Sequence, residues 1–118
     1  MIDLTILMTS YKEPILVRQA IKSMFLNLKL IGLEYEFIVV APDEETITSA
    51  ESTLKDLKIK HSSVIKDQLL GKPAAINLAL KHCKGANIVL TDGDVFVDKG
   101  AIIALLQELA SNKEIVAV

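Results

Sequence analysis

Two aspartates separated by one glycine, Asp92 and Asp94, are the residues best suited to binding a metal ion. They follow the short apolar run at residues 88–90, so we expect them at the carboxyl end of a strand. Such close carboxylates repel each other unless water, a cation or basic side chains compensate. Mg²⁺ and Mn²⁺ take one or two protein carboxylates and complete their coordination with waters and phosphate oxygens. The pair therefore indicates a divalent metal with a phosphorylated ligand, and a solvated helix-capping turn is the alternative.

A second candidate is Lys72, which lies between Gly71 and Pro73 at the expected start of a helix. The free N–H groups and the positive dipole end of a helix attract phosphate at that place. A lysine there is unfavourable to the dipole unless an anion accompanies it. The segment therefore predicts a phosphate contact, and a solvated surface lysine is the alternative.

Two further polar segments follow expected strands, at residues 9–13 and 42–45. Tyr11 in the first segment offers an aromatic face to a base, although tyrosines often simply pack on loops. Asp43 in the second is either a turn residue or a ligand contact. Because ligands of open α/β sheets bind beyond the carboxyl ends of the strands, we expect all four segments to converge.

The elements that must position these segments alternate along the chain. Apolar runs at residues 4–8, 37–41, 59–65 and 88–90 predict four strands. Apolar residues at intervals of three and four predict a helix after each strand, and the third of these helices carries Cys83 on its apolar face. The run at 59–65 is more polar and suits a sheet edge. This order predicts an α/β fold with three layers, α/β/α, around a mostly parallel sheet.

The composition fits one folded domain of 118 residues, because 51% are hydrophobic and only 24% are charged. A net charge of −2 without a block of one sign argues against general nucleic-acid binding. No apolar run approaches the roughly 20 residues of a membrane span, and the N-terminus lacks the features of a signal peptide. The single cysteine excludes an intrachain disulfide and fits a reducing compartment. We therefore expect a cytoplasmic protein.

Several familiar sites are absent from the sequence. The first strand-to-helix segment has no glycine, so the dinucleotide fingerprint is missing, and Gly71-Lys72-Pro73 does not fit a P-loop. His61 and His82 fall in different elements and do not suggest zinc. No nucleophile elbow surrounds Ser10.

Four motifs, in this order, resemble the nucleotide-sugar-binding half of the family-two glycosyltransferases, which have the Rossmann-like GT-A fold. They lie at residues 6–13, 37–43, 71–79 and 91–95. The resemblance covers residues 1–118 and implies a domain that binds a UDP- or GDP-linked sugar with Mg²⁺ or Mn²⁺. It implies that this domain is the donor-binding part of an inverting glycosyltransferase.

The resemblance also assigns roles to individual residues. The family often has two aspartates where this chain has Ala41-Pro42, which moves the expected base contact to Asp43, and Lys12 replaces a frequent asparagine. The roles implied are Thr9, Tyr11 and Glu13 bordering the nucleoside, Asp43 bonding the base, Lys72 near the nucleotide, Asp92 contacting the ribose or sugar, and Asp94 holding the metal.

In the family, the acceptor site and the catalytic base come after the point that corresponds to Val118. We therefore expect a truncated domain that lacks the acceptor-binding half, we name no catalytic residue or acceptor, and we do not expect sugar transfer by this chain alone. Asp98 would instead cap the next helix. The strand-like run at residues 114–118 would lack its family neighbour in the sheet, so we expect a homo-oligomer.

Two other functions remain open from the residues alone. A non-catalytic nucleotide-binding or regulatory α/β domain has the same organisation. A receiver-like signalling domain is less consistent, because it needs acidic residues at the end of the first strand, where this chain has Thr9 and Ser10.

Overall fold

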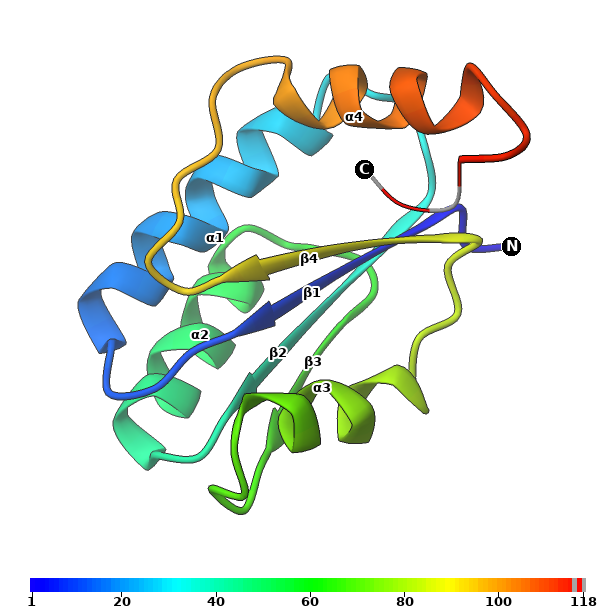
Figure 1. The fold of residues 1–118 in the computed structure, drawn as a ribbon. Helices are drawn as coiled ribbons and strands as arrows, with labels where there is room; N and C mark the ends of the chain where they lie inside the picture. Colours follow the sequence, from blue (N-terminus) through cyan, green and yellow to red (C-terminus); the bar gives the residue numbers. More distant parts are fainter. Residues whose placement is uncertain (116, 118) are drawn as a thin grey trace.

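A computed structural model describes residues 1–115 and 117, in which strands and helices alternate along the chain (Figure 1). None of the helices in this part of the chain is long and apolar enough to cross a membrane. The strand expected at residues 114–118 includes Val116 and Val118, which lie outside the described residues. The elements are β1 (Leu4–Thr9), α1 (Pro14–Leu28), β2 (Tyr35–Ala41), α2 (Glu44–Asp56), β3 (Ser62–Lys66), α3 (Lys72–Leu80), β4 (Asn87–Asp92) and α4 (Ala101–Ala110).

The four strands form one parallel sheet in the order β3-β2-β1-β4. β1 and β2 are the central strands and are buried on both faces, as their continuous apolar runs predict. β3 lies at an edge, which confirms the inference from its polar sequence.

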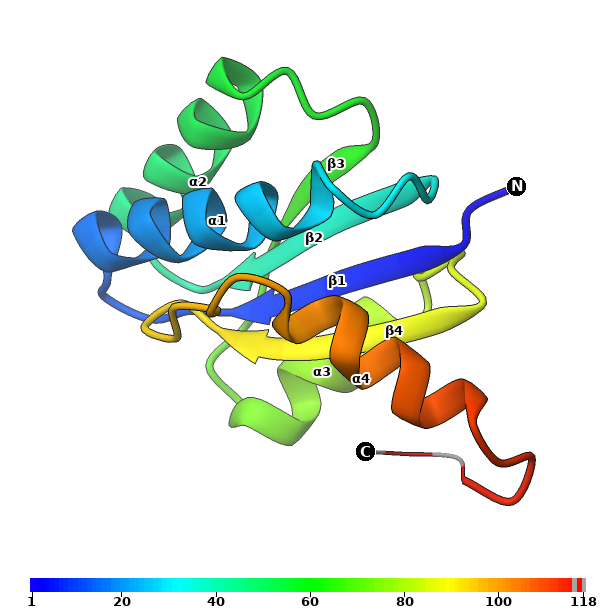
Figure 2. The ribbon, with the colours of Figure 1, turned by 90° about the horizontal axis from the view of Figure 1, so that it is seen from above.

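The helices cover both faces of the sheet and complete the three predicted layers (Figure 2). α1, α2 and α4 pack on one face, where Phe37 and Ile21 belong to the larger apolar core. α3 packs alone on the other face, where Ala75 and Ala79 meet Leu7 and Val40. The fold is therefore a three-layer α/β/α domain.

The register of the sheet brings the ends of three strands together. Thr9 at the end of β1 pairs with Val40 of β2 and with Asp92 of β4. Because the strands are parallel, the segments that follow all leave from the same edge of the sheet.

Two details of the helices differ from the prediction. α3 ends at Leu80, so Cys83 lies in the turn after the helix, where its thiol donates a hydrogen bond to the Ala79 carbonyl. The N-cap of α4 is Gly100, which has left-handed backbone angles, and not Asp98. Asp98 instead accepts a hydrogen bond through its backbone carbonyl from the Ala101 amide, which closes the turn before α4.

Candidate functional site

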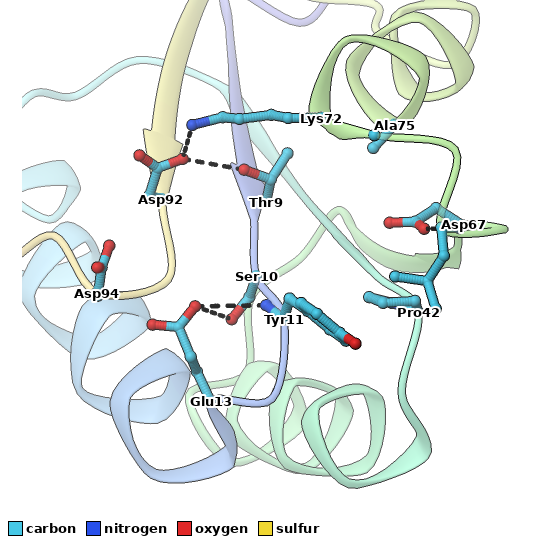
Figure 3. A pocket seen from close by; sticks show the side chains of 12 residues that line it. Thr9, Ser10, Tyr11, Glu13, Pro42, Asp67, Lys72, Ala75, Asp92 and Asp94 are labelled. Carbon is cyan, nitrogen blue, oxygen red and sulfur yellow. Dashed lines mark hydrogen bonds and ion pairs between the residues drawn. The ribbon is translucent and has the colours of Figure 1, made fainter.

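A pocket of about 470 Å³ opens at the carboxyl edge of the sheet (Figure 3). Six of the seven residues predicted for the site line it, and they come from β1, α3, β4 and the adjoining loops. The sequence-predicted residues that line it are Thr9, Tyr11, Glu13, Lys72, Asp92 and Asp94.

Lys72 and Asp92 form an ion pair across this pocket. The Lys72 ammonium lies 2.5 Å from Asp92 Oδ1, and the Thr9 hydroxyl donates to the same oxygen at 3.0 Å. The anion that a lysine at the start of α3 requires is therefore supplied within the chain by Asp92. Both side chains are still partly exposed, 56% for Lys72 and 40% for Asp92, so a ligand in the pocket can reach them.

These contacts change the acidity of Asp92. The hydrogen bond from Lys72 lowers the pKa of this carboxyl below its ordinary value. Partial burial opposes the change, and the hydrogen bond from Thr9 together with the charge of Lys72 adds to it. Asp92 is thus held as an anion at the end of β4.

Asp94 lies two residues further on, exposed at the same side of the pocket as Asp92 (Figure 3). The glycine between them is buried against the first loop, and a Cβ on Gly93 would overlap the Ser10 hydroxyl. Close contact with Ser10 therefore requires glycine at this position. This contact fixes the turn that presents Asp94.

The loop after β1 holds Tyr11 at the pocket. One oxygen of the Glu13 carboxylate accepts hydrogen bonds from the Ser10 hydroxyl and the Tyr11 amide, both at 3.3 Å. Lys12, which lies between Tyr11 and Glu13, has a φ of 54°, a left-handed conformation in which asparagine is enriched.

Asp43 is the one predicted site residue that does not line this pocket. It is the N-cap of α2, and its Oδ2 accepts hydrogen bonds from the Thr46 amide and hydroxyl. Its Oδ1 accepts the Lys12 amide at 3.0 Å. Burial raises the pKa of the Asp43 carboxyl, but the hydrogen bonds from Lys12 and Thr46 outweigh it, so the pKa lies below its ordinary value.

Two further pocket residues, Pro42 and Asp67, had no predicted role, although Pro42 belongs to the segment at residues 42–45 that was expected at this edge. The Asp67 amide donates to the carbonyl of Ala41, the last residue of β2, at 3.1 Å, which places Asp67 beside Pro42. The signal for Asp67 was present in the sequence, because it directly follows β3 and so falls at the ligand-binding edge. The weak pattern of β3 concealed it.

The loop between β3 and α3 ends at Gly71, the N-cap of α3, whose φ of 100° and ψ of 163° are accessible almost only to glycine. This turn sends the chain back toward the sheet and aims Lys72 at Asp92. Gly71 therefore helps to position Lys72 for its ion pair with Asp92.

Among residues 1–115 and 117, no three side chains of His, Cys, Asp or Glu are grouped so as to hold a metal ion by themselves. A cation here would need oxygen atoms from a ligand as well as from the chain.

Many solved structures share this fold, including the following two. A mannosyltransferase from Pyrobaculum calidifontis, PcManGT, in complex with GDP-Man and Mn²⁺, has a TM-score of 0.78 and 20% identity, over 91% of this chain and 32% of its own. Residues 1–349 of TarS from S. aureus have a TM-score of 0.74 and 16% identity, over 93% of this chain and 33% of their own. This chain thus spans about a third of each of these structures.

These likenesses show the fold, a three-layer arrangement of the GT-A type. No curated protein sequence matches the chain. The family model described as glycosyl transferase family 2 matches residues 5–118. Because that match covers nearly all of the sequence, this chain belongs to glycosyltransferase family 2.

Proposed function

We propose that this chain binds a nucleoside-diphosphate sugar together with Mg²⁺ or Mn²⁺, as the donor-binding part of an inverting glycosyltransferase. The observation that carries the proposal is one pocket lined by Tyr11, Lys72, Asp92 and Asp94. It combines an aromatic side chain, a cation at a helix start and two carboxylates, which are the groups that a nucleotide sugar with a metal requires.

The side chains divide the pocket into two ends in Figure 3. Lys72, Asp92 and Asp94 belong to the charged end, and Tyr11 and Pro42 lie away from it. We assign the diphosphate to the charged end, with Lys72 as its cation and Asp92 toward the ribose or sugar. The nucleoside is assigned to the other end, beside Tyr11. Thr9, whose hydroxyl donates to Asp92, and Glu13, which lies on the Asp94 side in Figure 3, would border it from the charged end.

The metal is assigned to Asp94. Its carboxylate is exposed, and in the described part of the chain it takes part in no ion pair, unlike that of Asp92. The pocket offers carboxylate and hydroxyl oxygens and no thiol or imidazole, a donor set suited to Mg²⁺ or Mn²⁺. A bound cation would neutralise charge on the departing diphosphate.

Two comparisons support this proposal. The chain belongs to a glycosyltransferase family, and the similar mannosyltransferase structure holds GDP-Man and Mn²⁺. We propose both UDP- and GDP-linked sugars as candidate donors.

Thermal unfolding with and without ligand tests the proposal. A ligand that binds only the folded chain raises the melting temperature in proportion to its affinity and concentration. UDP or GDP with Mn²⁺ is expected to raise the melting temperature, and the same nucleotide with a chelator is expected to raise it much less. No shift with either nucleotide in the presence of Mn²⁺ would refute donor binding.

A further inference from the structure

We infer that Asp67 selects the base of the nucleotide by accepting a hydrogen bond from the ring N–H of guanine or uracil. The inference rests on the proposed function, because it names the residue that reads the nucleoside end of the same pocket. Neither the sequence motifs nor the comparisons assign a role to Asp67.

Asp43 does not line the pocket, and both of its carboxylate oxygens already accept hydrogen bonds within the chain. Oδ1 accepts the Lys12 amide at 3.0 Å, and Oδ2 accepts the Thr46 hydroxyl at 2.6 Å and the Thr46 amide at 3.2 Å. A base that took Oδ2 would compete with the cap of α2, and one that took Oδ1 would share that oxygen with the amide of the loop that carries Tyr11. Asp43 therefore acts through the position of that loop.

Asp67 lies at the end of the pocket where the nucleoside is assigned. It lines the pocket with Tyr11 and Pro42 and is only partly buried. In Figure 3 its carboxylate lies on the side of the pocket away from Asp92 and Asp94. A nucleotide whose diphosphate occupies the charged end would extend its base in this direction.

Hydrogen bonds hold Asp67 in place and leave one of its carboxylate oxygens able to accept a hydrogen bond from a ligand. Its backbone amide donates to the Ala41 carbonyl at 3.1 Å, and its Oδ1 accepts the Leu69 amide at 2.7 Å. No other hydrogen bond to this side chain is present in the described part of the chain, so Oδ2 is available to a ligand. A fixed carboxylate of this kind is well prepared to read a base.

A carboxylate accepts hydrogen bonds and donates none, which determines the bases it favours. Guanine presents a ring N–H beside an amino group, and uracil presents a ring N–H between two carbonyls. Adenine and cytosine have an unprotonated ring nitrogen at the corresponding place, whose lone pair faces the carboxylate unfavourably. A site built around a substrate N–H discriminates against analogues that lack it.

Calorimetry with GDP, UDP, ADP and CDP, each with Mn²⁺, tests the inference on the wild-type chain and on Asp67→Asn. Asparagine keeps the shape and can still accept the Leu69 amide, but it replaces one acceptor by a donor. The matched control is Asp56→Asn, which removes an exposed carboxylate at the end of α2, outside the pocket.

The wild type is expected to bind GDP or UDP roughly tenfold or more tightly than ADP and CDP. Asp67→Asn should lose most of this preference while it retains dependence on Mn²⁺, and Asp56→Asn should match the wild type. An unchanged preference in Asp67→Asn would overturn the role of Asp67 and leave the proposed function standing. Failure of the wild type to bind any of the four nucleotides would overturn both.

Discussion

Lys72 and Asp92 are joined by a short contact between partly exposed side chains. Ion pairs with this degree of exposure contribute only about 0–1 kcal/mol to stability, because water and salt screen them. The pair therefore matters chiefly for the local charge of the pocket. An incoming diphosphate can bind the same ammonium that now faces Asp92.

Replacement of Lys72 by alanine is expected to weaken binding of GDP or UDP with Mn²⁺ by roughly 10- to 100-fold, because hydrogen bonds to charged groups contribute about 1.5–3 kcal/mol. The free energy of unfolding should change by about 1 kcal/mol or less. Calorimetry and urea unfolding measure the two effects. Lys81→Ala, at the other end of α3 and outside this pocket, is the control. Large destabilisation with unchanged affinity would show that Lys72 is structural.

The pKa of Asp92 should rise toward its ordinary value in Lys72→Ala, because the contact with Lys72 is the largest cause of its lowering. The sign follows from linkage, since the folded pKa lies below the unfolded one. The stability from this contact is present above the unfolded pKa and is lost as the pH falls through the folded pKa. NMR titration of the Asp92 carboxyl in both proteins measures the change, and equal values would contradict the assigned cause.

Residue types and spacing predicted which side chains gather at the site, but not how they pair. Lysine at the start of α3 indicated an anion, and the structure supplies Asp92, which lies 20 residues away in the sequence. The pairing of β4 with β1, on which α3 packs, brings these two together. No role was predicted for Asp67, because the apolar pattern of β3, the strand before it, is weak.

At the scale of elements, the N-terminus of α2 and the loop after β1 are built as one unit. Asp43 caps α2 and also binds the Lys12 amide, while the Glu13 amide donates to the Thr46 hydroxyl at 3.0 Å. The helix end therefore holds the loop that carries Tyr11.

Asp43→Ala is expected to lower the free energy of unfolding by about 0.5–2 kcal/mol, the usual cost of losing an N-cap. Nucleotide affinity should fall as well, because the Tyr11 loop loses its anchor. Asp43→Asn keeps an acceptor for the cap and should lie between the two proteins in both measurements. Urea unfolding and calorimetry test this, and an alanine variant as stable as the wild type would argue against the coupling.

The order of strands and helices could be read from periodicity, because each element has an apolar face of the right period. The ends of β3 and α3 could not be predicted in the same way. The strand predicted at residues 59–65 is observed at Ser62–Lys66, and α3 ends at Leu80, before Cys83. Element ends depend on caps and contacts from distant segments, such as the amide of Asp67 on Ala41, which local sequence does not reveal.

At the scale of the whole molecule, β4 forms an exposed sheet edge with apolar side chains. Ile88 is 41% exposed and Leu90 58% exposed, because α3 packs on β1 and β2 and leaves this part of the sheet uncovered. Edges of this kind favour association with another chain.

The chain is expected to self-associate as its concentration rises, and Leu90→Lys is expected to shift it toward a monomer, because a charged residue opposes edge pairing. Light scattering coupled to gel filtration measures both proteins. The control is Gln107→Lys, which adds the same charge at an exposed position of α4, outside the strands. A monomeric wild type at high concentration would contradict the expectation.

The central claim is that Asp94 brings a divalent cation to a bound nucleoside diphosphate. Calorimetry of GDP and UDP with Mn²⁺ and with chelator, on the wild type, Asp94→Asn and the control Asp98→Asn, tests it most directly. We predict that the wild type and Asp98→Asn bind nucleotide more tightly with Mn²⁺, and that Asp94→Asn loses most of this gain. The claim would be contradicted if Mn²⁺ did not tighten binding to the wild type, or if it tightened binding to Asp94→Asn by the same factor.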